Sequence, residues 1–222
     1  MGDIRDPHGP YGFVGEMKYI HKHGPQRFYT HWRKHIKGTQ DENFPEGLRN
    51  PLKAKLHDAL ISEQGYLCAY TLKRIGMTDS HIEHIKPQTV CRAECVGSDL
   101  NYANLLACYP KEGMEGGVRY GAQARGNWWE NGGKDFVKPL DVNCERRFRF
   151  NLDGEIKAVN GFVPAEITIE KLALDHATLT EDRKRVIQEF VYGKTGDDPI
   201  SFAKALYCKD IICLADREGK YL

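Results

Sequence analysis

The sequence has no apolar run that approaches the roughly 18 residues needed for a membrane-spanning helix. Residues 1–6 also lack the apolar segment of a secretory signal. The seven cysteines are an odd number and are too sparse for a scaffold held together by disulfides. These absences predict a cytoplasmic protein with reduced thiols and no membrane partner.

The sequence also has very little net charge. Its 32 Lys and Arg residues nearly balance 31 Asp and Glu residues, which leaves a formal charge of +1. The protein as a whole therefore does not attract nucleic acid, and any surface that binds it must be a local patch. A content of 28% charged and 41% hydrophobic residues is typical of a globular protein, and 222 residues can bury a sizeable core.

A short run of metal-ligating and basic side chains does occur, at residues 81–87 (His-Ile-Glu-His-Ile-Lys-Pro). Two isoleucines flank Glu83 and His84, and Pro87 ends the run, which predicts a short strand closed by proline. Adjacent side chains in a strand point to opposite faces. Glu83 can therefore hold a divalent cation while His84 reaches a water molecule, a division of labour that suits phosphodiester hydrolysis.

Together with Asn104, the Glu83-His84 pair and Pro87 resemble the His-Asn-His (HNH) motif of nucleases with the ββα-metal fold. The order of several further motifs along the chain is more closely similar to the retron-associated HNH family, which includes the PtuB proteins of the Septu anti-phage system. The resemblance covers roughly residues 45 to 190. It is carried by residues 64–70, 81–87, 100–106, 137–140, 144–148 and 172–176.

This resemblance implies a metal-dependent endonuclease with three central residues. His84 is expected to be the general base, since an imidazole with an ordinary pKa of about 6.5 accepts a proton near neutral pH. Glu83 is expected to bind the metal, and its hard oxygen donors favour Mg²⁺ or Mn²⁺. Asn104 is expected to orient the His84 loop by hydrogen bonding across the turn.

The sequence departs from the family at the second protein ligand of the metal. Ala122 stands at that position and cannot bind a cation. Gln123 and Asn127 are nearby amides that can substitute for it, and His81 can join Glu83 because residues two apart in a strand share a face. The departure leaves open an enzyme whose metal site is completed by substrate phosphates or by a partner.

Many members of the family hold a structural zinc ion with two pairs of cysteines. Here one cysteine of each pair remains, Cys68 and Cys108, and both partners are missing. Two thiolates cannot form the four-ligand site of a structural zinc. Cys91 and Cys95 are alternative thiolates at helical spacing, but we expect no structural zinc.

Basic residues near Trp128 and Trp129 suit phosphate contact and base stacking, unless the tryptophans fill the core. We expect Lys86, Arg119 and Arg125 to contact nucleic acid. The resemblance implies DNA more than RNA as substrate and an ATPase partner of the PtuA type. Two alternatives are an HNH module without catalysis that serves as a binding subunit, and a toxin-like RNase that cleaves tRNA.

The expected fold is α+β, with a ββα-metal nuclease core embedded in a mainly helical protein with a small β-hairpin. We divide it into an irregular and helical leader (1–49), the nuclease core (50–160) and a C-terminal helical region (161–222), packed as one unit. Asn50 is the expected N-cap of the first long helix, and Thr180 of a later one. The expected elements are helices at 28–37, 51–64, 122–129, from 165 onward and at 199–216, a strand at 82–85, a short helix or strand-to-helix junction at 101–108, and a hairpin at 148–158.

Overall fold

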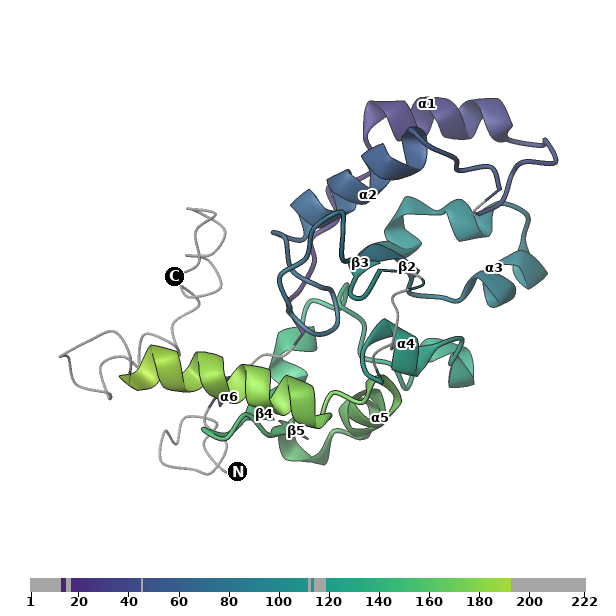
Figure 1. The fold of residues 1–222 in the computed structure, drawn as a ribbon. Helices are drawn as coiled ribbons and strands as arrows, with labels where there is room; N and C mark the ends of the chain where they lie inside the picture. Colours follow the sequence, from purple (N-terminus) through teal and green to yellow (C-terminus); the bar gives the residue numbers. More distant parts are fainter. Residues whose placement is uncertain (1–12, 15–16, 45, 112, 114–118, 193–222) are drawn as a thin grey trace.

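A computed structural model describes residues 13–14, 17–44, 46–111, 113 and 119–192 (Figure 1). Over these residues the protein is α+β, as expected, with helices around small antiparallel sheets. The helix expected at 199–216 lies outside the described residues. Within the described part, no helix is long and apolar enough to span a membrane.

Two helices, α1 (Arg27–Ile36) and α2 (Leu52–Glu63), precede the first hairpin and confirm the two helices expected there. The apolar stripe of α2 is buried, and Gly65, with φ of 65°, follows the helix end. The expected cap is wrong. Pro51 occupies the N-cap position and no side chain caps the helix, so Asn50 lies one residue too early.

The central hairpin consists of β2 (His81–His84) and β3 (Leu105–Cys108), which pair antiparallel with His84 opposite Leu105. All four residues of β3 are buried and extended, so the short helix is wrong for this segment, and the strand follows a helical turn instead of preceding one as the expected junction had it. Helical structure is confined to the preceding 3-10 turn, η2 (Tyr102–Asn104). A continuous apolar run suits a strand covered on both faces. Figure 1 shows the hairpin between α2 and α4 (Ala122–Arg125), and α2 packs on both strands.

A second sheet has the strand order β1-β4-β5, all antiparallel, from β1 (Phe13–Val14), β4 (Phe148–Phe150) and β5 (Ile156–Ala158). The expected hairpin at 148–158 is confirmed. Two helices follow it, α5 (Val163–Leu172) and α6 (Ala177–Tyr192). The later helix begins three residues before Thr180, because the His176 ring accepts a hydrogen bond from the Thr178 N–H and occupies the capping position.

The helix expected at 122–129 is a single turn, α4, which ends at Gly126 with φ of 51°. Another short helix, α3 (Gln88–Glu94), follows Pro87. One cluster of buried apolar side chains runs through the described part, from Met17 to Ile187. Both sheets contribute to this cluster, so the central hairpin is supported from several sides. The arrangement is consistent with an HNH-like fold.

Candidate functional site

The side chain of Asn104 closes the turn that follows β2. Its Oδ1 accepts a hydrogen bond from the Lys86 N–H at 2.7 Å, and its Nδ2 donates to the Lys86 carbonyl at 2.9 Å. The Asn104 carbonyl also accepts from the Ile85 N–H. These contacts fix the chain just after His84 to the start of β3.

The His84 ring is almost completely buried, with 4% of the residue exposed. Its Nε2 lies 2.9 Å from the carbonyl oxygen of Asp99. Because a carbonyl only accepts, Nε2 carries the proton of the neutral ring and Nδ1 is the basic nitrogen. Burial lowers the pKa of His84, which Glu83 and the Asp99 carbonyl only partly oppose. The ring is therefore neutral and able to accept a proton at neutral pH.

Two other side chains surround this imidazole. The edge of the Phe44 ring packs against it, with the ring centroids 4.8 Å apart. The amide nitrogen of Gln88, from α3, lies 3.4 Å from Nδ1, which is longer than a good hydrogen bond. Among the residues that the structure describes, only this weak contact occupies the basic nitrogen.

Glu83 faces the opposite side of β2. The burial of the strand alternates, with Ile82 and His84 buried and the other two residues half-buried, as the sequence period predicts. Oε1 of Glu83 lies 2.5 Å from Arg125 Nη2, and Oε2 lies 3.4 Å from His81 Nε2. Burial alone would raise the pKa of Glu83, but His81 and Arg125 outweigh it and hold the pKa below its usual range. The carboxylate is therefore charged.

The His81 ring lies between two oxygen atoms. Its Nδ1 lies 2.5 Å from the Pro110 carbonyl and donates to it, and its Nε2 lies 3.4 Å from Glu83 Oε2. A protonated ring donates from Nε2 to this carboxylate, whereas a neutral ring with its proton on Nδ1 turns a lone pair toward it, and a divalent cation would then join the two groups. Metal-binding histidines commonly donate their other N–H to a backbone carbonyl in this way.

These two donors fit a divalent cation as a partial set of ligands. The described residues contain no group of three or more His, Cys, Asp and Glu side chains that could hold a metal ion. Further ligands would therefore have to come from water, substrate phosphates or other parts of a complex. Gln123 and Asn127, the other expected ligands, are exposed. The described contacts of the Glu83 oxygens are those to Arg125 and His81.

Arg125 is placed differently from the prediction. Only 4% of the residue is exposed, and it donates to the carbonyls of Ile85 at 2.6 Å and His84 at 2.5 Å as well as to Glu83. Its guanidinium also lies near the rings of Tyr70 and Phe136. The expectation that Arg125 contacts nucleic acid is therefore corrected, because the side chain at the end of the one-turn α4 reaches inward to β2.

The other two expected nucleic-acid contacts differ from each other. Lys86 forms an ion pair with Glu94 of α3, so its charge is balanced within the protein. Arg119 is exposed. Trp128 and Trp129 are both half-buried against the core cluster, which favours packing as their role.

The two remaining cysteines of the expected zinc pairs lie together in the core. Cys68 and Cys108 are completely buried and hydrogen-bond to each other, and the Tyr109 N–H donates to Cys68 Sγ at 3.4 Å. Burial acts to raise the pKa of Cys68, but hydrogen bonds from Cys108, Thr71 and two backbone N–H groups lower it to about 6. Burial raises the pKa of Cys108. Hydrogen bonds and packing thus satisfy both sulfur atoms.

The protein is expected to fold without zinc, because these two sulfur atoms have hydrogen-bond partners and, among the described residues, too few companions for a closed site. Elemental analysis of the purified protein should find far less than one zinc ion per chain. Incubation with 1,10-phenanthroline should leave the melting temperature unchanged. A drop in melting temperature that added zinc reverses would contradict this prediction.

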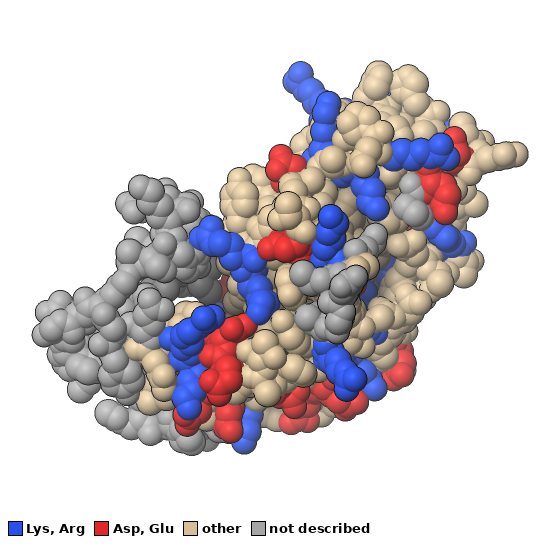
Figure 2. Space-filling model, viewed as in Figure 1, with Lys and Arg blue, Asp and Glu red and all other residues tan. Residues whose placement is uncertain are grey.

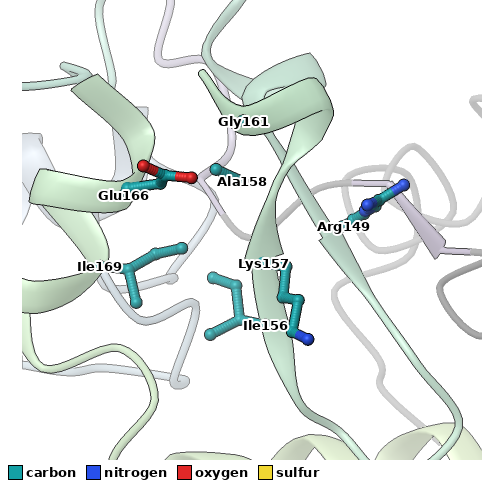
Figure 3. Close-up of a pocket in the computed structure, with 7 residues that line it drawn as sticks. All are labelled: Arg149, Ile156, Lys157, Ala158, Gly161, Glu166 and Ile169. Carbon is teal, nitrogen blue, oxygen red and sulfur yellow. The ribbon is translucent and has the colours of Figure 1, made fainter. Parts of the chain in front are cut away.

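The structure also contains a cavity of about 350 Å³ that includes none of these site residues. It lies between the β4–β5 hairpin and α5, and Figure 3 shows Glu166 and Ile169 facing Ile156 and Ala158 across it. Its lining residues are Arg149, Ile156, Lys157, Ala158, Gly161, Glu166 and Ile169. The cavity therefore takes no part in the site around Glu83 and His84.

Fold and site together define an α+β protein in which an imidazole and a carboxylate lie on opposite faces of a strand, with an asparagine closing the adjoining turn. No family model matches the chain. A Vibrio cholerae serotype O1 biovar El Tor protein named "Retron Vc95 putative HNH endonuclease" is 26% identical over 147 residues, which cover 64% of this chain and 67% of that protein. This similarity supports a relationship with HNH endonucleases.

Proposed function

We propose that the protein is a metal-dependent HNH endonuclease that hydrolyses phosphodiester bonds of nucleic acid. The observation that carries the proposal is the arrangement around β2. A neutral imidazole with a basic Nδ1 and a charged carboxylate occupy adjacent positions, and Asn104 fixes the turn that follows them. The similarity to a protein named as an HNH endonuclease supports the same reaction.

His84 would act as the general base. Its Nδ1 can take the proton of an attacking water molecule, and the Asp99 carbonyl stabilises the imidazolium that results. Water would replace Gln88 at Nδ1, which costs little because that contact is long. The burial of His84 keeps the ring in the neutral form that can accept the proton.

Glu83 and His81 would hold one Mg²⁺ or Mn²⁺ ion through Oε2 and Nε2. When bound, the cation would neutralise charge on the phosphate oxygens and the leaving group. Arg125 binds the other carboxylate oxygen and so holds Glu83 in place for this role. A site with two protein ligands leaves positions for substrate, which is how magnesium is commonly held beside phosphates.

In this proposal the enzyme is the effector of a bacterial anti-phage system of the retron or Septu type. It acts on DNA in the cytoplasm together with a PtuA-like ATPase. The sequence resemblance and the word retron in the relative's name support this setting. The rival is an HNH module that has lost catalysis and only binds nucleic acid or a partner. The burial of His84 and the ion pair of Glu83 with Arg125 favour this rival.

Cleavage assays distinguish these two functions. Supercoiled plasmid, linear duplex and tRNA are incubated with Mg²⁺ or Mn²⁺ and with the wild-type protein, His84→Ala or His23→Ala, each with and without the ATPase. We expect the wild type and the exposed-histidine control His23→Ala to cleave equally. Loss of the general base should slow cleavage by about 10²–10⁴-fold. Background cleavage by all three proteins under every condition would favour the rival, and cleavage of tRNA alone would identify an RNase.

A further inference from the structure

Two of the three cations expected to contact nucleic acid near the site form ion pairs within the protein. Lys86 pairs with Glu94, and Arg125 is buried against Glu83. A substrate with one negative charge per nucleotide nevertheless needs a cationic surface. In a chain with a net charge of +1, that surface must be local.

Residues 17–40 form the most one-sided segment of charge in the described part. They contain six Lys and Arg residues and no Asp or Glu. Lys22 and Arg33 pair with acids from neighbouring segments, Glu63 and Glu42. The other four cations of the segment are Lys18, Arg27, Lys34 and Lys37.

Helix α1 directs part of this charge toward solvent. Its apolar side packs on the core through Phe28, Tyr29, Trp32 and Ile36. The opposite side carries residues at the spacing i, i+4, i+7 and i+8, which share one face of a helix. These residues are Arg27, His31, Lys34 and His35, and all four are exposed. We call this set the outer face of α1.

The helix rests directly on the segment that holds the site together. The Tyr29 hydroxyl donates to the Leu100 carbonyl at 2.8 Å, and Arg33 donates to the Gly97 carbonyl at 3.2 Å. Residues 97–104 include Asp99, which binds the His84 ring, and Asn104, which closes the turn. The outer face is therefore held at a fixed position, about one helix diameter of 10 Å from this segment.

The spacing of the two permanent charges suits a phosphate backbone. Arg27 and Lys34 are seven residues apart, or roughly 10 Å along the helix axis. This distance corresponds to about three base steps along one strand of a duplex. Figure 1 shows α1 along the outer edge of the molecule, and Figure 2 shows Lys and Arg side chains projecting from the end formed by α1 and α2.

We propose that the outer face of α1 binds the sugar-phosphate backbone of the nucleic-acid substrate and anchors it beside the site. The inference rests on the proposed function, since it assigns a binding surface to that reaction. The face offers cations and N–H donors, which contact phosphates without reading the base sequence. It contributes affinity and leaves the chemical step to the residues around β2.

The test compares Arg27→Gln/Lys34→Gln with Lys184→Gln/Arg185→Gln, a control of equal charge change that removes one lysine and one arginine from α6, where they pair with Asp153 and Asp182. Binding of fluorescent duplex and single-stranded oligonucleotides is measured in EDTA over a series of salt concentrations. We expect the affinity of the α1 variant for both oligonucleotides to be lower than that of the wild type by about tenfold or more at low salt. The magnitude of its slope of log affinity against log salt should fall by roughly 1.4–1.8, since each of the two lost phosphate contacts contributes roughly 0.7–0.9. The α6 variant should match the wild type, and both should keep the wild-type melting temperature.

An unchanged salt slope for the α1 variant would overturn the inference, as would a wild-type protein that binds neither oligonucleotide. A polyglutamate peptide serves as a further probe. If the α1 variant loses binding to the peptide alone, the face binds an acidic protein instead. Because EDTA prevents metal-dependent cleavage, binding is scored separately from the reaction. If the salt slope of the α1 variant falls as expected but the wild-type protein has no nuclease activity, the proposed function is wrong and the binding surface stands.

Discussion

Replacing Arg125 with methionine is expected to lower the free energy of unfolding by about 3–5 kcal/mol, the usual cost of removing one partner of a buried ion pair. The substitution leaves the largely buried Glu83 carboxylate without its guanidinium. It also removes the donor that satisfies the carbonyls of His84 and Ile85. Urea unfolding followed by circular dichroism measures the change, and cleavage should be lost with it.

A double-mutant cycle separates the ion pair from general packing. Glu83→Gln/Arg125→Met should be more stable than Arg125→Met alone, because no unpaired charge is left in the core. Arg183→Met is the control, since Arg183 also donates to two backbone carbonyls, those of Gly154 and Leu174. It should cost about 1–3 kcal/mol. Strict additivity of the Glu83 and Arg125 substitutions would contradict a coupled pair.

Elements whose signals are local could be predicted from the sequence. The apolar stripe of α2 and the Asn-Leu-Asp-Gly turn at residues 151–154 each specify their structure within a few residues. The nature of β3 could not be predicted this way. A run of four apolar residues is too short to distinguish the period of a helix from that of a strand. The pairing of this run with β2 is a contact between segments that lie far apart in the sequence.

In the site, too, the features set by local sequence could be predicted and those set by distant contacts could not. The strand period places Glu83 and His81 on one face and His84 on the other, and the structure has this alternation. The sequence left His81, Gln123 and Asn127 as alternative metal ligands, and in the structure the His81 ring faces Oε2 of Glu83. Arg125 lies forty-two residues from Glu83. The inward direction of its side chain depends on where α4 packs, which no local pattern specifies.

Asn104→Ala is expected to slow cleavage by about 10²-fold, the cost of a displacement of about 1 Å in a catalytic group. The substitution releases both the N–H and the carbonyl of Lys86, which now bind the Asn104 amide. The turn after His84 then loses its attachment to the start of β3. The loss should lie in kcat more than in KM, because Asn104 acts on the position of His84 and not on the substrate. Steady-state cleavage rates over a range of substrate concentrations measure both constants.

Two further variants test whether the amide clamp itself is responsible. Asn104→Asp keeps an acceptor for the Lys86 N–H but removes the donor to its carbonyl, so it should retain only part of the activity. Asn101→Ala removes a neighbouring amide whose Oδ1 accepts from the Ala103 N–H and does not touch Lys86, so its kcat should stay near that of the wild type. An Asn101 variant as slow as Asn104→Ala would mean that the whole segment at 97–104 positions His84. In that case the bond between the His84 ring and the Asp99 carbonyl, which the same segment carries, would be the contact that sets the rate.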